Sequence, residues 1–353
     1  MSRASLWRGV EAATLTAASI LAALVVFGAF VAIGGLDPLE MYRVLWLGAF
    51  GTRFSIETAL TRAAPLMLTA LCVAVPARAG LLIIGGEGAL VIGGLAAVLA
   101  GVALASVPPG LAVPAILLAG AAAGGLWIAV PAVLRLFRGV NETISTLLFN
   151  YLAIALLNHL VSGPIRDYSQ TLKPTSWPIE RAFMIGALPG SAVHWGLVYG
   201  VVACLVAYVV LYRTTAGFAM GILGGNLRAA QMAGLPVTRL ALVAAVCGGA
   251  AAGLAGGIEV AAVHGAASVS LVVSYGYAGI LVAFIARQNP LAVIFVALLV
   301  GGISASGGLL QRRFGMPDAA TLVLEGCIFL FVLASNTLYG RLRFLQPPAM
   351  APP

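Results

Sequence analysis

Charge is scarce in this chain. Of its 353 residues, 19 are lysine or arginine and 11 are aspartate or glutamate, so charged residues make up 8% of the chain and hydrophobic residues 61%. Soluble globular domains carry about 25% charged and roughly 45–50% apolar residues. The composition therefore excludes an ordinary soluble domain and indicates a protein whose solvent is the lipid bilayer.

Lysine is almost missing, and the nucleotide-binding motif that depends on it is missing altogether. The one lysine, Lys173, lies in TLKPTS, and no GxxxxGK[ST] sequence occurs. Without that phosphate-cradling loop and its lysine, we do not expect the chain to hydrolyse ATP itself. Any uphill transport must draw its energy from a partner subunit or from an ion gradient.

Cysteine is also rare, and no two cysteines have the spacing of a metal site or of a redox pair. The four, at positions 72, 204, 247 and 327, lie in apolar segments without a CxxC pair, so we expect neither a metal nor a cofactor. The net charge of +8 could favour nucleic acid or acidic lipid, but the arginines are scattered singly between hydrophobic runs. We therefore expect contact with membrane lipid and none with nucleic acid.

What the chain has instead is a series of long uncharged runs. An apolar stretch of about 18 residues or more predicts a spanning helix, and the prolines and glycine at 108–110 divide the longest run in two. About ten spanning helices follow, in one all-α polytopic membrane domain over residues 1–353. The runs cover residues 12–36, 88–134, 143–165, 182–212, 240–258, 260–286 and 288–310, with shorter stretches at about 56–77 and 319–337.

The arginines orient these helices. If the N-terminus is cytoplasmic, alternate crossings put the larger share of loop arginines on that side, as the positive-inside rule requires. The sequence thus predicts a multi-pass protein of the bacterial inner membrane with both termini in the cytoplasm. Three loops are long: one at about 37–55, one outside (periplasmic) at about 163–193 and one inside (cytoplasmic) at about 213–238.

Two groups of four helices, at about 56–162 and 239–337, would enter the membrane from opposite sides. That is the pattern of an inverted repeat. The residues that resemble each other between the groups are limited to glycine-rich turns before apolar helices, GGEGALVIGG at 85–94 and SYGYAGILVAF at 274–284. We therefore expect a possible inverted repeat of two four-helix groups.

One acid, Glu87, stands where glycines interrupt a hydrophobic run, in RAGLLIIGGEGALVIGG at 78–94. Broken helices of this kind line binding sites in transporters. Glu87 has two interpretations: a buried acid that lines the solute path, or a residue at headgroup level whose charge is favoured by a helix N-terminus.

Polar residues recur near one face of the next candidate helix, RGVNETISTLLFNYLAIALLNHL at 138–160. Asn141 is expected to cap its N-terminus. Asn150 must find a partner within the membrane, which is either another helix or a polar solute. The flanking rings of Phe149 and Tyr151 suit stacking on a sugar or a base, so these three residues are candidates for the solute path.

The inside loop contains a short helix with clear ends. In GGNLRAAQMAGLPVTR at 224–239, Asn226 is the expected N-cap, about two turns follow to Ala233, Gly234 is the C′ residue and Pro236 lies beyond. So short a helix is marginal alone in water and should dock on a partner, for which a cytoplasmic protein is the natural candidate.

Other polar residues in apolar segments are isolated. They are Glu259, His264 and Glu325. The alternative of a secondary transporter or channel, driven by an ion gradient, would use Glu87, Glu259 or Glu325 as its proton or cation site. The SASG sequence at 304–307 suggests an intramembrane serine nucleophile, but nothing in the sequence brings a histidine within its reach.

Several segments together are similar to the permease subunits of ABC importers for simple sugars and nucleosides, a family whose relatives import branched-chain amino acids. The resemblance covers about residues 56–337. The second segment is most like the nucleoside-import branch. The segments are APLMLTALCVAVPARAGLLIIGGEG at 64–88, GVNETISTLLFNYLA at 139–153, the inside loop at 224–239 and ARQNPLAVIFVALLVGG at 286–302.

The resemblance implies an alternating-access importer with three kinds of partner. These are an ABC ATPase subunit, a second permease that is either the same or a different chain, and an extracytoplasmic solute-binding protein. It also implies that the short inside helix couples to the ATPase. The family commonly has an asparagine and a glutamine where this chain has Ile83 and Ala89, which leaves open which solute is carried. The residues implied to couple to the ATPase are Asn226, Leu227, Arg228, Ala229 and Ala230.

Overall fold

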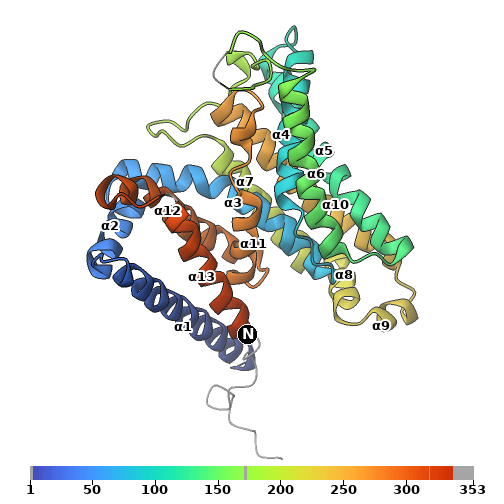
Figure 1. The fold of residues 1–353 in the computed structure, drawn as a ribbon. Coiled ribbons are helices and arrows are strands. Elements are labelled where there is room, and N and C mark those ends of the chain that lie inside the picture. Colours follow the sequence, from blue (N-terminus) through green and yellow to red (C-terminus); the bar gives the residue numbers. More distant parts are fainter. Residues whose placement is uncertain (1–2, 171–172, 318, 337–353) are drawn as a thin grey trace, which may run out of the picture. The chain divides into compact units, whose positions relative to one another are not determined.

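The described part of the chain is helical. The computed structural model describes residues 3–170, 173–317 and 319–336, with side chains placed for residues 14–335 of these ranges, and there it shows 13 α-helices and no strand (Figure 1). The helices are α1 (Arg3–Ile33), α2 (Pro38–Phe50), α3 (Arg53–Arg78), α4 (Gly86–Ala103), α5 (Pro109–Arg138), α6 (Glu142–Ser162), α7 (Gly196–Arg213), α8 (Thr215–Gly225), α9 (Leu227–Met232), α10 (Val237–Glu259), α11 (Tyr275–Ile285), α12 (Pro290–Phe314) and α13 (Ala319–Asn336).

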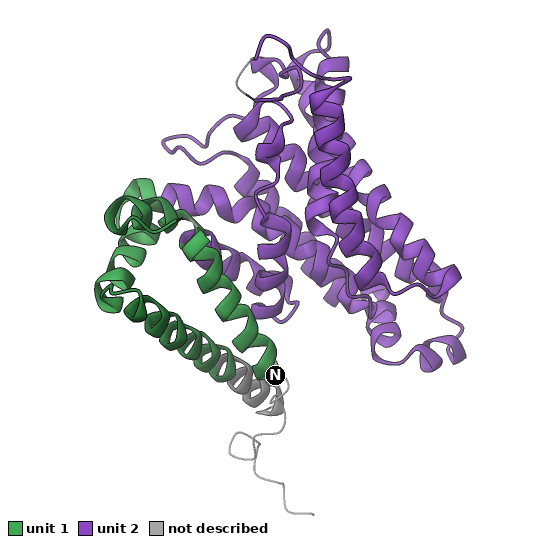
Figure 2. Ribbon diagram, in the orientation of Figure 1, with its two compact units in different colours: residues 1–55, 303–353 green, residues 56–302 purple. Residues whose placement is uncertain are grey.

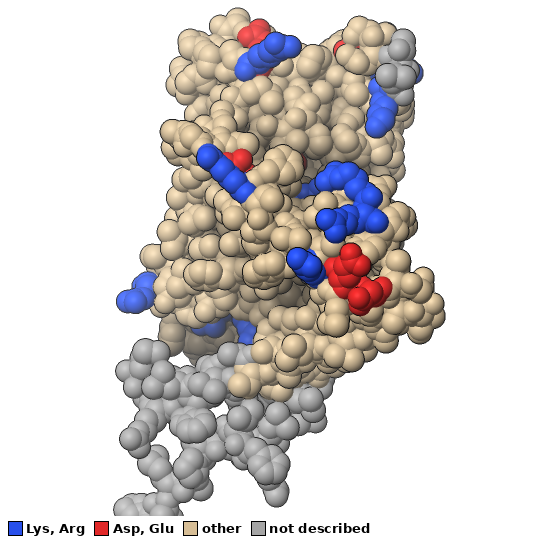
Figure 3. Space-filling view, turned by 90° about the vertical axis from the view of Figure 1, so that its left-hand side faces the viewer, with Lys and Arg blue, Asp and Glu red and all other residues tan. Residues whose placement is uncertain are grey.

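Within the described residues, eight segments are long and apolar enough to cross a membrane: α1, α3 to α7, α10 with the turn after it, and α12. Three shorter apolar helices, α8, α11 and α13, accompany them. Charged side chains are sparse on the face shown in Figure 3, which is mostly uncharged. The prediction of an all-α polytopic membrane protein is therefore confirmed.

The chain forms two compact units (Figure 2). Unit 1 comprises residues 1–55 and 303–353, and within it α1 packs along α13. Asp37 caps α2 by accepting from the Leu39 N–H at 2.9 Å. The hydroxyl of Tyr42 on α2 donates to the carbonyl of Leu24 on α1.

Unit 2 comprises residues 56–302 and has α4, α5 and α10 at its centre, where these three helices contact one another most extensively. Glycines make this possible. A Cβ added at Gly124 on α5 would lie 2.6 Å from the Gly249 carbonyl oxygen on α10, and one added at Gly256 would overlap the Leu90 carbonyl oxygen on α4. Small residues thus bring the backbones into direct contact, which is how spanning helices pack tightly in lipid.

Candidate functional site

The first interruption in unit 2 separates α3 from α4. After α3 ends at Arg78, Gly80 has φ +80° and residues 81–85 are not helical. A non-helical backbone within a membrane needs hydrogen-bond partners from the protein. The partners are side chains of α6: Thr143 Oγ1 donates to the Leu82 carbonyl at 3.0 Å, and Thr146 Oγ1 accepts from the Ile84 N–H at 3.2 Å.

Asn150 completes this set from the same face of α6. Its Nδ2 donates to the Ile84 carbonyl at 3.0 Å, and its Oδ1 accepts from the Gly88 N–H at 2.8 Å. The side chain is fully buried, and Nδ2 also lies 3.5 Å from the hydroxyl of Tyr277 on α11. Asn150 was expected to bind either another helix or a polar solute. In the structure it binds neighbouring helices and the segment between α3 and α4.

The two aromatic rings beside Asn150 lie in different environments, one packed against another helix and one exposed. Phe149 is partly buried, and its ring centroid lies 5.2 Å from that of Trp127 on α5. Trp127 also donates from Nε1 to the Phe149 carbonyl at 3.3 Å. Tyr151 is 62% exposed. The two rings therefore do not enclose one common site in this chain.

Glu87 joins the start of α4 to the start of α11. Its side chain is fully buried, and its carboxylate accepts from the backbone N–H of Ser274 at 2.9 Å and of Gly276 at 2.6 Å. These are amides at the N-terminus of α11, where the helix dipole favours an anion. Ser274 has φ +66°, and a Cβ at Gly276 would overlap the backbone of Glu87, so the two helix starts touch. The helix start that faces the carboxylate is that of α11, and whether Glu87 lines the solute path stays a prediction.

The second interruption follows α10. A π-turn, Val260–His264, ends with the Gly265 N–H donating to the Val260 carbonyl at 2.8 Å, and the chain then has only a short 3₁₀ turn before α11. The backbone of the loop at about 163–193, which is predicted to lie outside, binds this segment. Ile185 N–H donates to the Ala261 carbonyl at 2.7 Å and Ile179 N–H to the Gly265 carbonyl at 2.8 Å.

The same loop makes two further contacts with the segment. Ser176 is buried, its N–H donates to the Ala267 carbonyl, and its Oγ accepts from the Ala267 N–H, both at 2.9 Å. At the end of the loop, His194 Nδ1 accepts from the Gly196 N–H at 3.1 Å. Burial lowers the pKa of His194, so its ring is neutral at physiological pH.

A cluster of charged and polar side chains lies beside the second interruption. His264 Nε2 is 3.6 Å from Glu259 Oε2, and Arg62 on α3 lies within electrostatic range of Glu259 and Tyr275. In the sequence Glu259 and His264 are isolated polar residues, and no motif singles out Arg62. About two hundred positions separate Arg62 from the other two, and no local pattern connects them.

The inside loop has the short helix that was predicted. Asn226 Oδ1 accepts from the Ala229 N–H at 3.1 Å and caps α9, and Gly234 follows with φ +69°. Ala230 is fully buried in a cluster with Leu223 and other apolar residues, which fixes α9 to the rest of unit 2. Leu227 is 52% exposed and Met232 85% exposed, so α9 presents apolar side chains at the surface.

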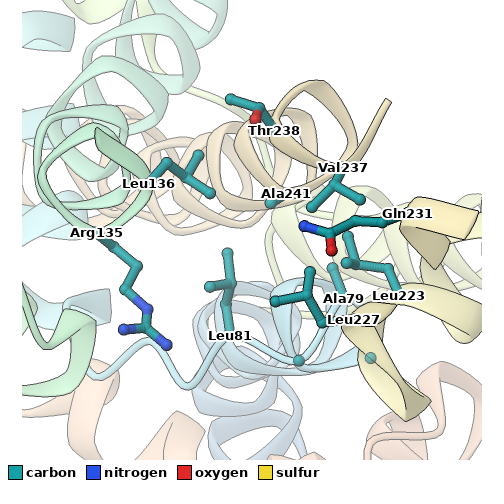
Figure 4. Close-up of a pocket in the computed structure, with 12 residues that line it drawn as sticks. Ala79, Leu81, Arg135, Leu136, Leu223, Leu227, Gln231, Val237, Thr238 and Ala241 are labelled. Carbon is teal, nitrogen blue, oxygen red and sulfur yellow. The ribbon is translucent and has the colours of Figure 1, made fainter. Parts of the chain in front are cut away.

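A pocket of about 540 Å³ opens beside α9 (Figure 4). Leu227 and Gln231 line it from α9, Leu136 and Arg135 from α5, and Leu81 from the first interruption. Arg135 Nε forms an ion pair with Glu142 Oε2 at 3.1 Å, at the start of α6.

The predicted cap on α6 is confirmed, since Asn141 Oδ1 accepts from the N–H of Thr143 at 2.9 Å and of Ile144 at 3.2 Å.

The remaining polar candidates lie in unit 1. Ser304 Oγ donates to Glu325 Oε1 at 2.6 Å, and Ser306 Oγ donates to the Ile303 carbonyl at 2.6 Å. Both hydroxyl protons of the SASG sequence are therefore bound within this unit. That arrangement joins α12 to α13 within unit 1.

Comparison with known proteins gives the family. Residues 55–333 match the model of the family described as branched-chain amino acid transport system / permease component. A glucose ABC transporter permease protein of Haloferax volcanii is 31% identical over 90% of this chain and 86% of its own length. A guanosine ABC transporter permease protein of Bacillus subtilis is 30% identical over 87% and 88%. A nucleoside ABC transporter permease protein of Lactococcus lactis is 25% identical over 84% of each chain. The chain therefore belongs to the branched-chain amino acid transport system / permease component family, and it is the permease subunit of an ABC importer.

Proposed function

We propose that this subunit carries a nucleoside or a simple sugar across the inner membrane and leaves ATP hydrolysis to a separate ATPase subunit. The support is the set of relatives named for glucose, guanosine and nucleosides, which align over 84–90% of the chain. Sugar hydroxyls are common to all three cargoes. The path is proposed to pass the first interruption, bordered by Glu87, Phe149, Asn150 and Tyr151.

The observation that supports a separate ATPase subunit is the structure of helix α9. This helix of six residues is capped by Asn226, held from behind by buried Ala230, and exposes Leu227 and Arg228. Helices this short gain stability by packing against a partner. We propose that Asn226, Leu227, Arg228, Ala229 and Ala230 form the contact with the ATPase subunit.

The other partners follow from the topology. We propose that both termini are cytoplasmic, that the outside loop at about 163–193 receives an extracytoplasmic solute-binding protein, and that a second permease, a copy of this chain or a different one, completes the path. Residues 337–353 at the C-terminus lie outside the described residues. ATP-driven closure of the ATPase would push α9 and rock the two permeases about a central path, an alternating-access cycle.

Copurification in mild detergent, followed by uptake of radiolabelled guanosine and glucose into proteoliposomes, tests the proposal. We expect an associated ATPase subunit and ATP-dependent uptake of one of the two solutes. A lone permease dimer whose transport follows a proton gradient would instead support the ion-driven alternative. Against that alternative, both oxygens of Glu87 are already bound by backbone amides.

A charge reversal on α9 tests the coupling contact. Arg228→Glu should abolish ATP-driven uptake while the protein remains folded in the membrane, because the exposed side chain makes no described contact within unit 2 that folding depends on. Arg43→Glu is the matched control, since Arg43 is also exposed but belongs to α2, on the predicted outside. Equal uptake by the two variants would contradict the assignment of α9.

A further inference from the structure

The polar atoms of Glu87 and Asn150 are bound by the chain's own backbone. A second group of polar side chains in unit 2 is arranged differently. Its members come from α3, from the end of α10 and from the start of α11. They are Arg62, Glu259, His264, Ser270 and Tyr275.

The π-turn is what brings His264 to Glu259. In an α-helix, residues five apart point in directions about 140° apart, at 100° per residue. The turn after Glu259 closes five residues apart instead, and it brings His264 Nε2 to 3.6 Å from Glu259 Oε2. Such π-turns within helices frequently occur at functional sites. Ser270 Oγ then lies 3.5 Å from the other ring nitrogen of His264.

The group is polar, central and partly open. Glu259 is 4% exposed, while the side chain of His264 is 21% exposed and Arg62 is also partly exposed. Arg62 and Glu259 both belong to candidate spans, α3 and α10. Charged side chains in a spanning helix face the interior of the bundle or a water-filled path, because their exposure to lipid is unfavourable.

We propose that Glu259, with His264 and Arg62 beside it, binds adjacent hydroxyls of the solute's sugar during its passage through the outer half of the membrane. A carboxylate has two acceptor oxygens and suits two neighbouring hydroxyl donors. An imidazole, a serine hydroxyl and a guanidinium supply further polar contacts, and the ring of Tyr275 offers an apolar face. Neighbouring hydroxyls are the feature that glucose and guanosine share. This assignment rests on the proposed function.

The test uses the full complex with its ATPase and binding protein in proteoliposomes. Glu259→Gln should lower ATP-driven uptake of guanosine or glucose about ten-fold or more, because it removes a charged acceptor from the hydroxyls. Glu325→Gln is the matched control, a buried acid in unit 1 whose carboxylate is bound by Ser304. Uptake and ATP hydrolysis in Glu325→Gln should match those of the wild type.

Two outcomes separate this inference from the proposed function. If the wild-type complex shows no ATP-driven uptake of guanosine or glucose, the proposed function itself fails. If the wild type transports one of them and Glu259→Gln transports it as well as Glu325→Gln does, only the assignment of Glu259 is overturned.

Accessibility gives a test that does not depend on how Glu259→Gln folds. His264→Cys is made in a background where the incompletely buried Cys247 and Cys327 are serine. We expect a small charged thiol reagent to label it and guanosine or glucose to slow the labelling. Val206→Cys, at a 55% exposed position on α7, should stay unlabelled if that face meets lipid. Absence of labelling at 264, or labelling that neither solute slows, would overturn the proposal.

Discussion

The two interruptions in unit 2 are held in different ways. Residues 81–85 are bound by side chains of α6, a helix that is itself a candidate span. Residues 260–268 are bound mainly by the backbone of the outside loop, through Ser176, Ile179 and Ile185. Each interruption leads into the start of a helix, and Glu87 joins these two starts.

The first interruption is therefore held by a spanning helix, and the second is held by a loop that is predicted to lie outside the membrane. The first interruption keeps its shape as long as α6 stays in place, because Thr143, Thr146 and Asn150 bind it along one helix face. The second interruption depends on a loop to which a solute-binding protein is proposed to bind. We therefore expect changes near Glu87 and α6 to cost stability, and changes in the loop to have smaller effects on it.

The largest loss of stability is expected from Glu87→Ala. The change leaves the N–H groups of Ser274 and Gly276 without an acceptor in a buried place, at a cost of about 3 kcal/mol or more in the free energy of unfolding, since hydrogen bonds to charged groups contribute about 1.5–3 kcal/mol each. Thermal unfolding in detergent measures the loss.

Glu142→Ala is the matched control for Glu87→Ala. Glu142 is also an acid in the first turn of a spanning helix, but its partner Arg135 is 46% exposed, and exposed ion pairs contribute about 1 kcal/mol or less. If the two variants unfold at the same temperature, Glu87 does not join the two helix starts in the way described here.

A smaller loss is expected from Asn150→Leu, which keeps the size of the side chain and removes its polar atoms. The Ile84 carbonyl and the Gly88 N–H would lose their partner, at a cost of about 2–3 kcal/mol. Asn158→Leu on the same helix is the control, because Asn158 is exposed and surface changes usually stay within about 0.5 kcal/mol. Equal unfolding temperatures would mean that α6 does not hold the first interruption.

Features that depend on near neighbours could be predicted from the sequence. The apolar runs place the spanning helices, and the caps at Asn141 and Asn226 follow from residues two or three positions away. Contacts between distant positions could not be predicted this way. Glu87 reaches residues 274 and 276, and Asn150 reaches residues 84 and 88, and a repeating pattern shows the face of a helix but not what that face meets.

The smallest effect is expected from Ser176→Ala in the outside loop. The change removes the acceptor of the Ala267 N–H, while the backbone bonds of the loop remain, so the cost should be about 1 kcal/mol. Ser169→Ala, at an exposed position in the same loop, should change nothing measurable. The sensitive measurement is hydrogen exchange of the backbone amides of residues 261–268, because amide exchange detects local opening that occurs without global unfolding. Faster exchange in Ser176→Ala alone would show that the loop holds the second interruption, whereas equal exchange in both variants would mean that another part of the chain does.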